Sequence, residues 1–190
     1  SGAFLDCLFQ YNSAEGSGGA IFHHGSSLEI EGCLFRLNEA SESGGAIWNL
    51  SPMEIVNSTF HENVAAIEGG AIEGGDAVML SHVTITENLA LSAGGGLDVP
   101  SGSLQIVNSI VASNKAPTGS DCTNGTAPAL TVNNLVGDPD GCEGIAGPGA
   151  TPVEPYLGGL ADNGGPTLSQ AVLPISPAFG AGDCIDVDGD

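Results

Sequence analysis

Residues 35–47 read FRLNEASESGGAI, and residues 60–72 read FHENVAAIEGGAI. The same pair of motifs, Phe-x-x-Asn followed by Gly-Gly-Ala-Ile, occupies residues 9–21, and a weaker copy with GGGL in place of GGAI occupies residues 85–97. The glycine motif therefore returns every 25 or 26 residues. Two unrelated motifs that share one period indicate that one structural unit is stacked several times.

Within each repeat the apolar residues alternate with polar ones. Leu28 and Ile30 recur as Met53 and Ile55 one repeat later. An alternation of period two is typical of strands that bury one face, and no stretch shows the 3.6-residue pattern of a helix. Three short strands in each repeat predict an all-β fold, a right-handed single-stranded parallel β-helix of about five regular rungs, spaced about 4.8 Å apart.

The repeats divide the chain into three parts. Residues 1–136 are expected to form the coil with its period of about 25, and residues 137–182 an irregular, Gly/Pro-rich C-terminal cap packed on the coil. Prolines that remove strand hydrogen-bond donors occur throughout that second part. Residues 183–190 are expected to be an acidic tail or the start of a linker. The apolar residues expected to cover the coil are Leu157, Leu160, Leu168, Val172 and Leu173.

One asparagine occupies the same place in every repeat. These residues are Asn12, Asn38, Asn63, Asn88 and Asn114. Asparagine tolerates a left-handed backbone at a corner, and its amide can bond the amides above and below it. We therefore expect a structural ladder, and we expect the repeated glycines to form a tight corner.

Two parts of the sequence resemble known families. The tandem FxxN and GGA(I/L/V) motifs resemble the repeats of polymorphic outer membrane proteins, whose β-helical passenger regions are surface adhesins. Residues 134–138 (NLVGD) and 160–167 (LADNGGPT) resemble the C-terminal part of the choice-of-anchor Q family, although Phe179-Gly180 replaces the usual Ile-Asp. This resemblance implies an exported bacterial protein with a β-helical region ahead of a cell-surface anchor.

The charge of the chain excludes several classes of partner. Its 190 residues carry 23 acidic side chains against two basic ones, Arg36 and Lys115, for a net charge of −21. Nucleic-acid binding needs clustered basic residues, and an anionic membrane surface would repel the chain. No apolar run is long enough for a transmembrane segment. The chain opens directly in repeat sequence without a signal peptide, as expected of a mature or excised segment.

Acidic and histidine residues are the candidate metal ligands of the chain. Asp183, Asp186, Asp188 and Asp190 alternate around a glycine, as in the first half of a calcium-binding loop. The later acidic ligand of such a loop is missing, so a calcium site and a solvated acidic tail both stay open. The histidines, at positions 23, 24, 61 and 82, match no zinc-ligand spacing and are expected on the surface.

The five cysteines suggest one disulfide. Cys122 and Cys142 flank a Gly/Asn/Asp/Pro-rich excursion, and a disulfide between them would stabilise the fold by about 3 kcal/mol. Cys7 and Cys33 share one inward column; stacked free thiols are favoured there over a disulfide. Cys184 is then free or paired outside this segment.

Stacked carboxylates raise the question of catalysis. Glu29 is expected over Glu54, Glu62 over Glu87, and Glu73 over Asp98, all facing outward. Such evenly spread acidity favours a solvated surface over one tuned pair. Polysaccharide lyase chemistry would also need more cations than the chain has.

We therefore predict a non-catalytic, exported β-helix, a cell-surface or extracellular-matrix structural or adhesion module without catalytic residues. Its expected partners are further copies stacked end to end into filaments, neighbouring domains, or a host or matrix glycan or protein. The alternative is a carbohydrate-active enzyme, a glycoside hydrolase or polysaccharide lyase, which a cleft with one desolvated carboxylate pair would favour.

Overall fold

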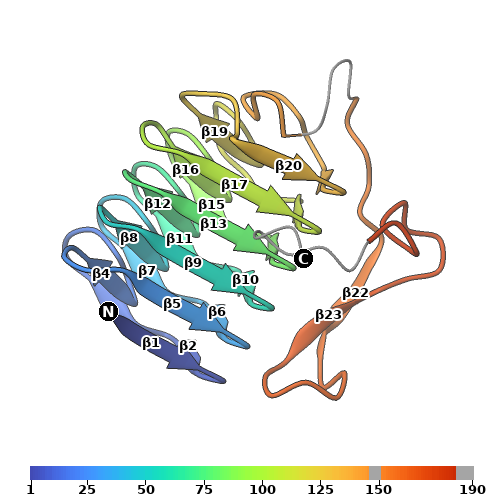
Figure 1. Ribbon diagram of the computed structural model, residues 1–190, viewed down its shortest axis with the longest axis horizontal. Helices are drawn as coiled ribbons and strands as arrows, with labels where there is room; N and C mark the ends of the chain where they lie inside the picture. The colour runs from blue at the N-terminus through green and yellow to red at the C-terminus, as the bar shows by residue number, and fades with distance from the viewer. Residues whose placement is uncertain (146–150, 183–190) are drawn as a thin grey trace.

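The computed structural model describes residues 1–145 and 151–182. Within these residues every regular element is a β-strand, and most strands stack in parallel into a coil (Figure 1). The predicted all-β parallel β-helix of about five turns is confirmed. Each of the first four turns contributes one strand to each of four sheets, which we name A to D, and the later turns extend sheets A, B and D.

Sheet A contains β1 (Gly2–Leu5), β5 (Leu28–Glu31), β9 (Met53–Val56), β13 (Val78–Ser81), β17 (Leu104–Val107) and β20 (Leu130–Val132). Sheet B contains β2 (Leu8–Gln10), β6 (Leu34–Arg36), β10 (Thr59–His61), β14 (Thr84–Thr86), β18 (Ile110–Ala112) and β21 (Leu135–Val136). Sheet C contains β3 (Ser13–Ala14), β7 (Glu39–Ala40), β11 (Val64–Ala65) and β15 (Leu89–Ala90). Sheet D contains β4 (Ile21–His23), β8 (Ile47–Asn49), β12 (Ile72–Gly74), β16 (Leu97–Val99) and β19 (Cys122–Asn124). The prediction of three strands per turn missed sheet C, because strands of two residues are too short to show an alternating pattern.

The interior of the coil consists of straight columns of like residues. Ile30 pairs in register with Ile55, and Phe35 pairs with Phe60, as predicted. The Phe35 ring lies parallel to its neighbours, with centroids 4.5 Å from Phe9 and 4.6 Å from Phe60. Because each apolar side chain lies on its counterpart in the next turn, the core is one continuous cluster along the coil.

The predicted asparagines form a buried hydrogen-bonded ladder. The Asn63 side-chain oxygen accepts the backbone N–H and the side-chain amide of Asn38, at 3.1 and 2.8 Å. Its own amide donates to Asn88 Oδ1 and to the Phe35 carbonyl. At the far end a carboxylate replaces the next amide, since Asp121 Oδ1 accepts both donors of Asn114. This last member could not be predicted, because Asp121 lies outside the repeated motif.

The prediction of a left-handed backbone at the asparagines is wrong. The residue before each asparagine has the positive φ instead, for example 53° at Leu37, 55° at Glu62 and 58° at Glu87. The ladder holds the asparagine backbone N–H, and the preceding residue absorbs the turn. That position carries no repeated residue type, which is why no motif marks it.

The two glycines of each Gly-Gly pair serve different purposes. The first has a positive φ, as at Gly44 with 66°. The second lies against the next turn, since a Cβ on Gly45 would lie 2.1 Å from the carbonyl oxygen of Gly70. The pair is therefore required both by the corner itself and by the close stacking of corners.

The segment after β21 covers the last turn of the coil. Cys142 and Ile145 are buried in the core cluster, and Cys142 forms a disulfide with Cys122, with Cα atoms 5.2 Å apart. The disulfide thus joins this covering segment to the first strand residue of β19.

The remainder of the tail lies along the flank of the coil. Strands β22 (Leu157–Ala161) and β23 (Ser169–Val172) form an antiparallel hairpin beside sheet B (Figure 1). Leu157 and Val172 pack against the outer side of β18 and β21, whereas Leu168 and Leu173 remain 37% exposed. This hairpin therefore packs on the flank of the coil, runs along the stack and does not cover its end.

The ladder leads to a stability prediction. Replacing Asn63 with alanine removes the acceptor of two Asn38 donors in a fully buried corner, and should lower the free energy of unfolding by about 1–3 kcal/mol. Urea denaturation measures the loss. Asn12→Ala is the matched control, because Asn12 occupies the exposed end of the same ladder. Equal losses in the two variants would contradict a buried ladder.

Candidate functional site

The outward column of sheet D changes from aromatic to acidic along the coil. Phe22, Trp48, Glu73, Asp98 and Thr123 follow one another in register on successive turns. The rings of Phe22 and Trp48 stack with centroids 4.5 Å apart and an interplanar angle of 22°. Phe22 is 62% exposed, so this pair forms an apolar surface outside the core.

The acidic end of this column is partly covered. Asp98 is only 4% exposed, and ligand atoms of Glu68, Glu73 and Asp98 all lie within 4.8 Å of one another. Glu73 and Asp98 point outward from the coil, as expected, but Asp98 is covered and Glu73 is half-buried, so the expectation of a solvated pair is wrong. The glycine corner itself lies against this face, since a Cβ on Gly94 would lie 2.8 Å from the Cβ of Asp98, and Glu68 and Thr123 on the neighbouring turns adjoin the same carboxyl group.

Burial raises the pKa of both carboxyl groups. Desolvation raises the pKa of Glu73, and the nearby Asp98 and Glu68 charges raise it further, against hydrogen bonds from Ser43 and Trp48. Desolvation also raises the pKa of Asp98, although a hydrogen bond from the Thr123 hydroxyl opposes the change. The Glu73 Oε2 atom is buried without a hydrogen-bond partner. Keeping Glu73 and Asp98 ionised and close together at neutral pH therefore destabilises the fold.

A second cluster lies on the opposite side of the asparagine corner, where the coil meets the tail. Ligand atoms of His61, Glu62 and Glu87 lie within 4.8 Å of one another. His61 is 8% exposed, so the expectation of a surface histidine without metal-ligand neighbours is wrong at this position. The left-handed backbone at Glu62 interrupts the strand alternation, so the neighbouring His61 and Glu62 side chains fall on one side.

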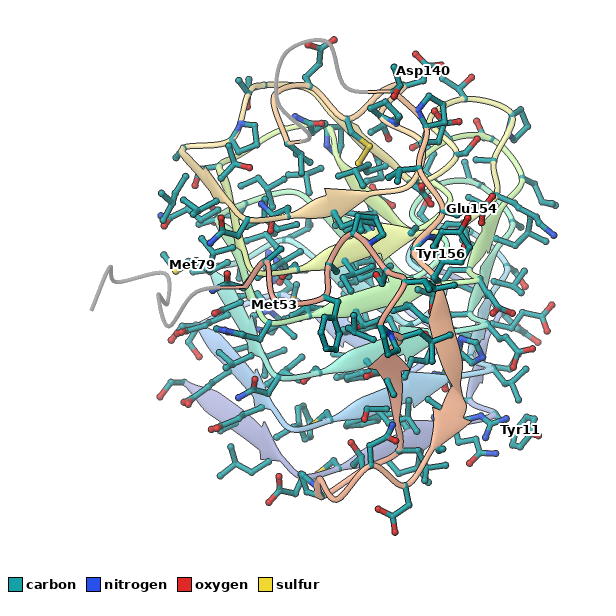
Figure 2. The ribbon with its side chains drawn as sticks, turned by 90° about the vertical axis from the view of Figure 1, so that its right-hand side faces the viewer. Tyr11, Met53, Met79, Asp140, Glu154 and Tyr156 are labelled. Carbon is teal, nitrogen blue, oxygen red and sulfur yellow. A yellow bond between two sulfur atoms is a disulfide. The ribbon has the colours of Figure 1, made fainter. Side chains whose placement is uncertain are left out.

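A pocket of about 290 Å³ adjoins this second cluster. Its walls include His61 and Glu87 from the coil, with Glu154, Tyr156 and Gln170 from the tail. Glu154 and Tyr156 lie beside each other where the tail passes the coil (Figure 2). The sequence could not indicate this pocket, because nothing in the repeats shows where the tail docks.

The remaining predicted site residues have varied outcomes. Cys122 and Cys142 are joined, while Cys7 and Cys33 are free thiols. The Cys33 sulfur accepts the backbone N–H of Cys7 at 3.4 Å, and burial raises the pKa of the Cys33 thiol. The proposed calcium ligands Asp183, Asp186, Asp188 and Asp190, together with Cys184, lie outside the described residues. Over residues 1–145 and 151–182, no helix is long and apolar enough to cross a membrane.

The raised pKa values of Glu73 and Asp98 predict a pH effect on stability. A carboxyl group with a higher pKa in the folded state binds more protons there, so stability should rise as pH falls from 7 toward the unfolded value of about 4. Asp98→Asn should raise the melting temperature at pH 7. It should also reduce the increase in melting temperature that the wild type shows as the pH falls from 7 to 5. The exposed Glu29→Gln is the control. A melting temperature at pH 7 that falls in Asp98→Asn would contradict this destabilisation.

Comparison with known proteins supports the fold. A family model described as a right-handed β-helix region matches residues 2–136. No curated protein and no solved structure matches the chain. The family match covers more than half of the chain and spans every strand of sheets A to D. The chain therefore belongs to the right-handed β-helix family.

Proposed function

We propose that this chain is a non-catalytic, exported β-helix that acts as a surface or matrix adhesion module, and that it binds glycans through the outer face of sheet D. The observation that carries the proposal is the stacked, solvent-facing pair of Phe22 and Trp48. Aromatic rings contribute most to stability when buried, so a large exposed pair suggests a binding role.

The chemistry around the aromatic pair suits a carbohydrate. A sugar ring offers apolar C–H groups to an aromatic surface and hydroxyl donors to acceptors at its edge. Glu42 is exposed and Glu68 is half-buried, and both belong to the segments that precede the glycine corners beside sheet D. A net charge of −21 would repel polyanions, so a neutral or cationic glycan is the favoured partner.

Export is supported by the resemblance of residues 160–167 to the choice-of-anchor Q family. In the structure this block forms the end of β22 and the following turn of the hairpin, and the Thr167 hydroxyl donates to the Gly32 carbonyl at 2.9 Å. The block thus joins the tail to the second turn of the coil. A rigid coil with a docked tail is a suitable spacer between an anchor and a ligand.

The carbohydrate-active enzyme is the rival function, and the desolvated pair of Glu73 and Asp98 favours it. A general acid must come within about 3 Å of the glycosidic oxygen. The Glu73 Oε2 atom and the Asp98 side chain are both enclosed, which keeps them from a substrate on this face. For this reason we place binding, and not hydrolysis, at sheet D.

The proposal is tested with an array of neutral oligosaccharides and with titration of the best ligand. Trp48→Ala should weaken binding at least about tenfold, equivalent to about 1.4 kcal/mol, because it removes half of the stacked surface. Phe179→Ala is the control, since Phe179 is an exposed aromatic in the tail. Equal affinity in wild type and Trp48→Ala would refute the site. Release of new reducing ends, lost in Asp98→Asn, would favour the enzyme.

End-to-end association is the second part of the proposal. Strands β1 to β4 lie at one edge of sheets A to D, and side chains on this first turn are more than half exposed, including Leu5, Leu8 and Tyr11. Unpaired strand edges with apolar side chains favour pairing with another copy. Light scattering should therefore show a mass that grows with concentration, and that growth should shrink in Leu8→Lys. A constant monomer mass at high concentration would contradict association.

A further inference from the structure

We propose that His61, Glu62 and Glu87 form a binding site for one divalent transition-metal ion of the Zn²⁺ type, beside the pocket between the coil and its tail. The residues come from two consecutive turns, on sheet B and the corner that follows it. This site lies apart from the aromatic face of sheet D, and its existence does not depend on glycan binding.

A chain of hydrogen bonds orients the imidazole. The side-chain amide of Gln170 donates to the Gly158 carbonyl, and this turns Gln170 Oε1 toward Thr86. The Thr86 hydroxyl donates to Gln170 Oε1. The Thr86 oxygen is then free to accept a hydrogen bond from the N–H at His61 Nδ1, with the two atoms 3.3 Å apart. In the neutral ring Nε2 therefore carries the lone pair. A ring nitrogen fixed in this way by an outer hydrogen bond is the usual arrangement of a metal-binding histidine.

That lone pair faces a carboxylate. His61 Nε2 lies 3.6 Å from Glu62 Oε2, which is too long for a hydrogen bond. An ion about 2.1 Å from each atom would span this separation at an angle of about 118°, close to the tetrahedral value of about 109°. His61 is 8% exposed, and among the described residues no hydrogen bond occupies its Nε2, which leaves this nitrogen available to an ion at the pocket.

The third ligand and the open position complete the site. Glu87 adds a carboxylate whose oxygen lies within 4.8 Å of the other two ligand atoms. The adjoining pocket of about 290 Å³ has room for water, which would complete a four-coordinate ion with three protein ligands. Nitrogen with carboxylate oxygen is a ligand set that suits zinc better than calcium.

The local charge also favours a cation. Two carboxylates converge on the site, and Glu154 borders the same pocket. Arg36 is the residue in register with His61 on the preceding turn, yet among the described residues it forms no ion pair with Glu62 or Glu87. A bound ion would offset this negative charge and would link two turns of the coil beside the docked tail.

Zinc titration of the full chain, freed of metal with a chelator, tests the proposal by calorimetry. We expect one Zn²⁺ per chain and an affinity at least about tenfold weaker in Glu87→Gln, which keeps the size of an exposed side chain while removing its charge. Glu29→Gln on sheet A and Glu73→Gln in the sheet D cluster should bind within about twofold of wild type.

A second measurement identifies the ligand independently of affinity. In NMR spectra, Zn²⁺ should shift the ring signals of His61 and leave those of the exposed His24 unchanged. The proposal is overturned by an absence of saturable binding, by wild-type affinity in Glu87→Gln, or by an unshifted His61. Loss of binding in Glu73→Gln alone would place the ion in the sheet D cluster and would also overturn it.

Discussion

In-register stacking of successive turns is the constraint on which the rest of the structure depends. Every strand of the coil hydrogen-bonds to the strand one turn away, so any displacement of one turn would break four sheets together. The asparagine ladder fixes this register at a corner, because each Oδ1 accepts two donors from the preceding turn. The glycine corners reinforce it, since no side chain larger than hydrogen fits between them.

Stacking also explains why side chains on the coil surface become functional candidates. A column places equivalent positions about 4.8 Å apart, whatever their residue types. Aromatic residues in such a column form a stack, as Phe22 and Trp48 do. Carboxylates in a column are forced together, and Glu73 with Asp98 remains close despite mutual repulsion. The coil thus holds like charges close together, and the burial of apolar side chains in the core offsets their repulsion.

The sequence was sufficient to predict the coil and its register. The period of the FxxN and GGAI motifs located the interior columns, including the pairing of Phe35 with Phe60. The period of the motifs did not predict burial at positions where neighbouring segments cover the outer face of a sheet. Asp98 is adjoined by Glu68 and Thr123 on the neighbouring turns, and the pocket at His61 depends on the tail. Those contacts join residues far apart in sequence, and no repeated motif records them.

Amide hydrogen exchange tests the central claim most directly, because it measures the opening of each turn separately. Strands of the middle turns, β9, β10, β13 and β14, should exchange slowest, together with the buried side-chain amides of Asn63 and Asn88. Protection should decrease toward β1 and β2 and should be lowest in the β22–β23 hairpin. Fast exchange of the Asn63 side-chain amide, or a hairpin protected more strongly than the middle turns, would contradict a structure held by stacked register.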